Sequence, residues 1–164
     1  MLKEAKFVYG NNIDTDRIIP GKYTKTLDMN TLKEHCLEDL DADFSKQVQE
    51  GDILVAGDNF GCGSSREQAP LALKQSGISI VIARYFARIF FRNAINIGLN
   101  VLEIPEHDIE KGDQIEFYLQ DNKVYNLSKN KTYSCNSLSP VMLKILEEGG
   151  MVNYLKKYNN YPED

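Results

Sequence analysis

The clearest chemistry in this chain lies in a short run of small, polar and cationic residues. Residues 57–70 read GDNFGCGSSREQAP, between an apolar run and a helical pattern. A strand, a glycine-rich turn and a helix start together form a general anion-binding device, because unpaired backbone N–H groups point outward there. Arg66 adds a guanidinium that holds a carboxylate through two hydrogen bonds, beside the hydroxyls of Ser64 and Ser65. The run therefore predicts a site for a small phosphate or carboxylate.

The glycine spacing disfavours nucleotide binding. After Gly61 and Gly63 the third glycine of a dinucleotide fingerprint is missing, and no Lys-Ser or Lys-Thr pair of a Walker loop follows. A serine is a poor base near neutral pH, so a catalytic role needs hydrogen-bond donors and a cation close to it. The residues alone leave two interpretations open: Ser64 and Ser65 cap the following helix, or they belong to an active site.

The composition is that of an ordinary globular chain. Its 164 residues are 42% hydrophobic and 26% charged, a length that predicts one domain over residues 1–164. The net charge of −5 offers no basic surface for nucleic acid. No stretch approaches the ~20 apolar residues of a membrane span, and the N-terminal residues lack the apolar core of an export signal. We therefore expect a cytoplasmic protein with neither nucleic acid nor membrane as a partner.

The cysteines and histidines predict no metal ligand in this chain. Cys36, Cys62 and Cys135 are odd in number and widely spaced, which argues against a disulfide framework and against a zinc or iron–sulfur site built by this chain alone. His35 and His107 lie far apart in polar surroundings, and we expect both to be solvated.

Apolar runs that alternate with helical patterns predict the elements that position the glycine loop. This alternation indicates an α/β fold with a parallel layer, and the alternating run at 113–138 adds antiparallel strands beside it. In the helix after the second buried strand, Phe86, Ile89, Phe90 and Ala94 are expected on the inner face. A closing helix should begin at Ser139-Pro140, break at Gly149-Gly150 and resume. The other predicted strands are 5–10, 52–57, 78–83 and 100–104, and the predicted helices are 29–40, 65–77 and 85–98.

Three motifs, in order along the chain, resemble one known family. "NNIDTDRIIPGKY", "GDNFGCGSSREQAP" and "YFARIFFRNAINIGLNVLE" resemble the swivel-domain subunit of the aconitase superfamily. More narrowly, the chain resembles the small subunits of the isopropylmalate isomerases (3-isopropylmalate dehydratases), of the short type found in archaea and many bacteria. With "PVMLKILEEGGMVNYLKK" the resemblance covers nearly the whole chain. It implies a swivel-type β/β/α domain with mixed parallel and antiparallel strands.

The resemblance also implies an activity and a partner. Members of the family are hydro-lyases of leucine biosynthesis, which interconvert 2-isopropylmalate and 3-isopropylmalate by removing and re-adding water. The 4Fe-4S cluster that they use is held by a separate large subunit. This chain is therefore expected to hold no metal, to be inactive alone, and to act on a small 2-hydroxy di- or tricarboxylic acid in a heterodimer.

Site residues follow from the resemblance position by position. The proton-transferring base falls on Ser64, and Ser65 and Arg66 help to position it and to bind a substrate carboxylate. Gly61 and Gly63 shape the loop around these side chains. Cys62 is a loop residue with no ligand role.

The early motif supplies supporting residues near the active site. These are Asp14, Thr15 and Asp16, for which a turn held by Asx hydrogen bonds is an equally good interpretation. The segment 23–28 reads the variable part of the substrate in this family, and here it presents Thr24 and Lys25. A lysine offers either its charge to a carboxylate or its methylene stem to an apolar group, so the preferred substrate stays open.

Other functions stay open at this point. Within the same chemistry they are homoaconitase, citraconate (methylmalate) hydratase and 2,3-dimethylmalate dehydratase. From other classes they are a stand-alone module that binds small carboxylates and a purely structural interaction protein. One further departure from the family pattern is Gln68, which stands where the family commonly has histidine.

Overall fold

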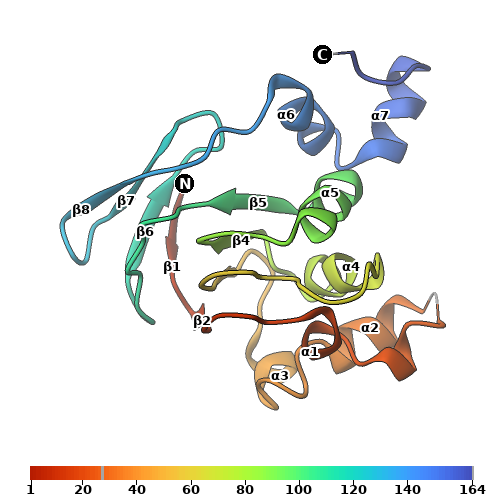
Figure 1. The fold of residues 1–164 in the computed structure, drawn as a ribbon, viewed down its shortest axis with the longest axis horizontal. Coiled ribbons are helices and arrows are strands. Elements are labelled where there is room, and N and C mark those ends of the chain that lie inside the picture. The colour runs from red at the N-terminus through yellow and green to blue at the C-terminus, as the bar shows by residue number, and fades with distance from the viewer. Residues whose placement is uncertain (27, 164) are drawn as a thin grey trace.

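A four-stranded parallel sheet forms the middle layer of the computed structural model, which describes residues 1–26 and 28–163 (Figure 1). The strand order follows the chain order, so every crossover runs in the same direction and every crossover helix lies on the same face. Figure 1 shows α4 and α5 on that face and the second sheet on the other. The strands are β2 (Phe7–Val8), β3 (Ile53–Val55), β4 (Ile80–Ala83) and β5 (Asn100–Glu103).

The second sheet is antiparallel and covers the face that the helices leave free. Its order is β1-β6-β7-β8, so the N-terminal strand pairs with a strand from the second half of the chain. The antiparallel section predicted at 113–138 is confirmed, but the strand over residues 2–4 was not predicted. The strand predicted over 5–10 is the shorter β2, in the parallel sheet. The strands are β1 (Leu2–Glu4), β6 (Gln114–Phe117), β7 (Lys123–Asn126) and β8 (Lys131–Ser134).

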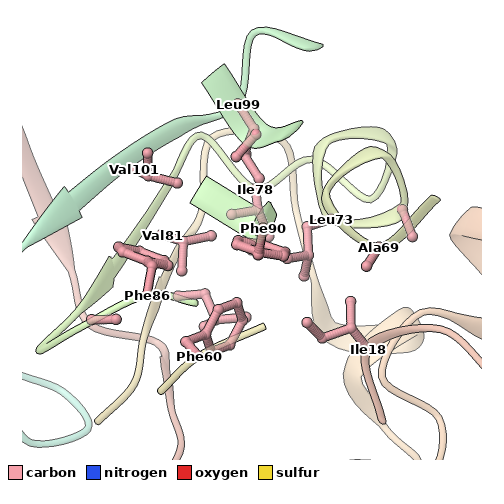
Figure 2. Packing of buried hydrophobic residues seen from close by; sticks show 14 of the residues in the cluster. Ile18, Phe60, Ala69, Leu73, Ile78, Val81, Phe86, Phe90, Leu99 and Val101 are labelled. Carbon is pink, nitrogen blue, oxygen red and sulfur yellow. The ribbon is translucent and has the colours of Figure 1, made fainter. Parts of the chain in front are cut away.

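The two faces of the parallel sheet explain why its central strands, β3 and β4, are continuously apolar. Leu54 and Val81 point into the core beneath the helices, whereas Ile53, Val55 and Ile80 point into the core between the sheets. Successive side chains of a strand alternate between faces, so a strand buried on both faces carries no polar position. Figure 2 shows the helix-side core, in which Val81 and Val101 lie with Leu73 of α4 and Phe90 of α5.

The two crossover helices begin later than predicted. α4 (Gln68–Gln75) starts at Gln68, not at Ser65, and within the described chain no side chain caps its first turn. Pro70 is the third helical residue, where its missing N–H has no partner to lose. α5 (Arg88–Ile97) ends at Gly98, as predicted, with a left-handed φ of 81°. One predicted inner residue is wrong: Ile89 is 51% exposed.

Smaller helices cover the other end of the parallel sheet. The helix predicted over 29–40 ends at His35, because Leu37 turns to a positive φ of 57° and its N–H donates to the Ile18 carbonyl (2.8 Å). The link predicted after it contains a short helix that buries Phe44 against Phe7. The elements are α1 (Thr15–Ile18), the 3-10 helix η1 (Gly21–Tyr23), α2 (Met29–His35) and α3 (Phe44–Gln47).

The closing helices pack on α5 through a close backbone approach. Ser139 caps α6 (Pro140–Glu147) by accepting from the Met142 N–H, as predicted for a start at Ser139-Pro140. α7 (Met151–Tyr158) follows the predicted glycine break. A Cβ at Gly98 would lie 2.3 Å from the Gly149 carbonyl oxygen, so only glycine lets the two backbones meet. None of the described helices is both long and apolar enough to cross a membrane.

The prediction that both histidines are solvated is wrong. His107 is buried, its Nε2 lies 2.7 Å from the Ala56 carbonyl oxygen, and its Nδ1 accepts from the Ile109 N–H. This pattern fits the neutral ring, and burial lowers the pKa of His107. His35 is half-buried, stacked on Tyr23 and within 2.6 Å of a Glu38 carboxylate oxygen. The polar sequence neighbours of His107 misled here, because the ring is buried by its contact with Ala56, 51 residues earlier in the chain.

The buried ring of His107 predicts a pH-dependent stability. Its pKa is lowered in the folded state, so below about pH 6.5 the unfolded chain binds a proton that the folded chain resists. The free energy of unfolding should therefore be highest above that pH and should decrease as the pH is lowered below it. Urea unfolding between pH 7.5 and 5 measures it. The fall should shrink in His107→Gln and persist in His35→Gln, and an equal fall in His107→Gln would contradict the assignment.

Candidate active site

The glycine loop lies at the edge of the parallel sheet where the strands end, next to the start of α5. The Phe60 N–H donates to the Tyr85 carbonyl (3.0 Å), and the Ala87 N–H donates to the Phe60 carbonyl (2.9 Å). These two bonds run the loop alongside the residues that follow β4. Ligands of open α/β sheets bind at this edge, beyond the carboxyl ends of the strands.

Gly61 is what allows the loop to lie flat on α5. Its φ is +82°, and a Cβ built there would lie 2.3 Å from Phe90 Cγ. Gly63 has a φ of +97° with more room around it. The left-handed backbone at Gly61 and Gly63 directs Ser64 toward α5, and α4 begins four residues further on, at Gln68. The interpretation that Ser64 and Ser65 cap this helix is wrong, because Glu67 occupies the N-cap.

The early motif packs against the other side of the loop. The Gly61 N–H donates to the Ile13 carbonyl (2.7 Å), and the Thr15 N–H donates to the Cys62 carbonyl (2.8 Å). Asp14 caps α1 by accepting from the Arg17 N–H, which is the turn that the residue types predicted. Segments about 50 residues apart in the sequence are thereby joined.

Thr15 contacts Ser64 directly. The buried Thr15 hydroxyl donates to the Ser64 carbonyl (3.1 Å) and lies 3.4 Å from Ser64 Oγ. Ser64 itself is exposed. Its side chain lines a surface hollow whose other lining residues are Gly61, Gly63, Ala87, Arg88, Ile89 and Arg92.

Arg66 is engaged by an acidic residue of the early motif. Its guanidinium forms an ion pair with Asp16, and it lies over Gly21, where a Cβ would be 3.2 Å from Nη2. The Arg66 side chain is 26% exposed and that of Asp16 is 63% exposed. Since surface ion pairs of this kind contribute little, a substrate carboxylate can compete for the guanidinium.

The predicted specificity segment is tied to α4. The Thr24 hydroxyl donates to the Gly21 carbonyl (2.7 Å), and the Gln68 amide donates to the Thr24 carbonyl (2.9 Å). Gln68, which stands where the family commonly has histidine, thus supplies a hydrogen bond to this segment. Lys25 is exposed beside these contacts. Leu27, in the same segment, lies outside the described residues.

The cysteines of this chain do not form a cluster site. Cys36, Cys62 and Cys135 are free thiols in three different places, and burial raises the pKa of Cys36 to about 12 and that of Cys135 to about 11. Across residues 1–26 and 28–163, no three His, Cys, Asp or Glu side chains come together as a metal-binding group. An iron–sulfur cluster therefore does not fit the residues described in this chain.

Arg88 and Arg92 are site residues that the sequence analysis missed. They face the same hollow as Ser64, from the first two turns of α5. A spacing of four residues puts two side chains on one helix face. That spacing, at the start of the helix after a buried strand, is the signal that would have found them.

The contact of Thr15 with Ser64 predicts a kinetic effect. In Thr15→Val, which keeps the shape of the side chain, both hydroxyl contacts to Ser64 are lost. If Ser64 is the base that the resemblance implies, kcat of the enzyme assembled with a large subunit should fall roughly tenfold with little change in KM, because a hydrogen bond that orients Ser64 is removed. Steady-state kinetics measures this. A tenfold rise in KM at constant kcat would instead place Thr15 in ground-state binding.

Comparisons with known proteins agree with this architecture. The family model of the aconitase C-terminal domain matches residues 11–107. The 3-isopropylmalate dehydratase small subunit of Clostridium beijerinckii is 50% identical over 157 residues, which cover 94% of this chain and 98% of that protein. The 2,3-dimethylmalate dehydratase small subunit of Eubacterium barkeri is 50% identical over 155 residues, 93% and 95% of the two chains.

A solved structure extends the likeness to the fold. The crystal structure of 3-isopropylmalate dehydratase from Methanocaldococcus jannaschii matches with a TM-score of 0.89 at 48% identity, over 97% of this chain and 96% of that one. The predicted α/β swivel-type fold is confirmed. The chain therefore belongs to the aconitase C-terminal domain family and, within it, to the small subunits of the 3-isopropylmalate dehydratase type, which are parts of hydro-lyases.

Proposed function

We propose that this chain is the small subunit of a 3-isopropylmalate dehydratase that interconverts 2-isopropylmalate and 3-isopropylmalate, in leucine biosynthesis. The observation that carries the proposal is the exposed Ser64, which lines an open hollow while its backbone and hydroxyl both contact the buried Thr15. Relatives with dehydratase names at about half identity over nearly the full length support it.

In this proposal Ser64 carries the proton. Dehydration breaks a C–H bond on one carbon and the C–OH bond on its neighbour. Ser64 Oγ accepts the proton and returns it on rehydration, and the hydroxide would leave to the Lewis acid that a partner-held cluster would supply. The Thr15 hydroxyl lies 3.4 Å from Ser64 Oγ, and by turning its one proton from the Ser64 carbonyl it donates a hydrogen bond to that oxygen in its basic state. Arg66 exchanges the carboxylate of Asp16 for a substrate carboxylate. The hydroxyl of Ser65 donates a hydrogen bond to the same substrate carboxylate.

The remaining parts of the enzyme are proposed to come from a partner. Because the described donors of this chain do not fit a cluster, we assign the 4Fe-4S cluster to a large subunit. The substrate then lies between the two chains, and the small subunit alone is inactive. We also propose that residues 1–164 form one swivel domain and that the heterodimer is cytoplasmic.

Co-expression with a dehydratase large subunit tests the proposal. The assembled complex should equilibrate 2- and 3-isopropylmalate, followed by chromatography or NMR, and neither subunit alone should do so. An assembled complex with an intact cluster and no turnover of either acid would overturn the proposed function.

A second candidate is a dehydratase of another substituted malate. The Eubacterium barkeri relative, named for 2,3-dimethylmalate, is as similar to this chain as the first relative named for isopropylmalate. The same complex should therefore be assayed with 2,3-dimethylmalate, citraconate and homocitrate-type tricarboxylates. The substrate with the highest kcat/KM decides between the candidates.

Lys25 gives a specific prediction for this comparison. Its exposed ammonium is available to a carboxylated side group, whereas an isopropyl group needs only the methylene stem. In Lys25→Ala, kcat/KM for a tricarboxylate should fall about tenfold, and kcat/KM for isopropylmalate should change less than about twofold. Equal losses on both substrates would show that the charge of Lys25 does not discriminate between them.

A further inference from the structure

Two guanidinium groups beside Ser64 have no counter-charge in the described structure. The ion pairs of residues 1–26 and 28–163 involve lysines, His35 and Arg66, and none includes Arg88 or Arg92. Both arginines are exposed. The chain as a whole carries a net charge of −5, so two adjacent free cations are a local feature and not part of a basic surface.

The carboxylate of Glu103 lies near the two arginines and is hydrogen-bonded to other residues. Arg88 and Arg92 also line a second hollow, together with Glu103. Glu103 accepts from the Phe86 N–H through one oxygen (2.9 Å) and from the Asn136 amide through the other (3.0 Å). Through these two hydrogen bonds the Glu103 carboxylate fixes the turn after β4. Since none of the described ion pairs joins Glu103 to Arg88 or Arg92, both guanidiniums remain available to another anion.

The hollow is built so that these cations and Ser64 face the same space. Gly61 lies flat on Phe90, which sits between the two arginines in α5. The bonds between Phe60 and residues 85 and 87 hold the loop at this place. Ile89, 51% exposed, adds apolar surface to the same lining. Hydroxyl, paired cations and an alkyl surface together match a small dicarboxylic acid with a branched apolar group.

We infer that Arg88 and Arg92 bind one carboxylate of the substrate dianion beside Ser64. This inference rests on the proposed function and deepens it, since it adds a second carboxylate-binding pair on the small subunit. Arg66, which is paired with Asp16, then serves the other carboxylate. A guanidinium pair holds a carboxylate through charge-assisted hydrogen bonds before and after proton transfer, so its contribution is to binding and not to the chemical step.

The test uses the complex assembled with the large subunit. In Arg88→Gln and in Arg92→Gln, we expect KM for isopropylmalate to rise about tenfold while kcat changes less than about twofold. Arg92→Lys should recover part of the loss because it keeps the charge. Lys123→Gln, an exposed cation on β7 in the other sheet, is the matched control and should leave KM unchanged.

A direct binding measurement separates this inference from the proposed function. Calorimetric titration of the Ser64→Ala complex with 3-isopropylmalate should show a Kd about tenfold weaker when Arg88→Gln is added, whether or not the wild type turns over. Unchanged Kd and KM in both arginine variants would overturn the inference. So would variants that lose affinity only for the large subunit in sedimentation experiments, which would make the pair a subunit contact. Loss of wild-type turnover alone would overturn only the proposed function.

Discussion

Ser64→Ala is expected to lower kcat of the assembled enzyme by about 10³-fold or more, the range that a positioned general base contributes. The side chain is exposed, and its hydroxyl only approaches the buried Thr15 hydroxyl at 3.4 Å, so folding should change little and assembly should not change. KM should stay within about threefold, because in the proposed site the carboxylates bind arginines and not this hydroxyl. Kinetics of the complex, with thermal melting of the small subunit, measures both effects.

Ser65→Ala is the matched control for Ser64→Ala. It removes the same atom from the neighbouring exposed position, and its effect should fall mainly on KM. If both variants lost kcat equally, the loop would act through its overall polarity. If Ser64→Ala kept more than about a tenth of wild-type kcat, Ser64 would not be the base.

Gly61→Ala should have the largest effect on the loop itself. Alanine at a φ of +82° is strained, and its Cβ would lie 2.3 Å from Phe90 Cγ, in a ring that is itself buried. We expect the free energy of unfolding to fall by about 2–4 kcal/mol, from backbone strain and overpacking together. The loop would lift from α5, so Ser64 would leave the hollow and kcat would fall at least tenfold.

Alanine variants at two other glycines distinguish backbone strain from overpacking as the cause of this loss of stability. Gly112 has a φ of +93° with no atom within 4 Å of a built Cβ, so Gly112→Ala should cost only the strain of about 1 kcal/mol. Gly10 has neither a positive φ nor a close neighbour, and Gly10→Ala should be neutral within about 0.5 kcal/mol. Urea unfolding of the three variants measures the series. Equal losses at residues 61 and 112 would contradict the close contact with Phe90.

Local patterns predicted those parts of the fold that local forces determine. The buried strands at β3, β4 and β5 read as apolar runs because both faces are covered, and Gly98 marked the end of α5. β1 escaped prediction because its residues form a strand only when β6, more than 100 residues later, supplies hydrogen-bond partners. Leu37 ended a helix early for the same reason, through a bond to Ile18.

In the candidate site, too, local features could be predicted from the sequence and long-range contacts could not. The glycine loop could be recognised in the sequence because it needs unusual residue types. Its resemblance to a family assigned roles to Ser64 and Arg66. The orientation of the loop could not be predicted from the sequence, because the backbone at Gly61 and Gly63 directs Ser64 toward α5 and not toward α4. Arg88 and Arg92 looked like ordinary polar positions of an amphipathic helix. The packing of Gly61 on Phe90, with the bonds from Phe60 to residues 85 and 87, brings them to the hollow of Ser64.

The central claim is that Ser64 moves the carbon-bound proton, and isotope exchange tests it most directly. The assembled enzyme is incubated with 2-isopropylmalate in D₂O, and NMR follows deuterium at the carbons between which the hydroxyl migrates. We predict incorporation at both positions with the wild-type small subunit and incorporation at least about 10³-fold slower with Ser64→Ala in an intact complex. Exchange in the Ser64→Ala complex at the wild-type rate would contradict the claim.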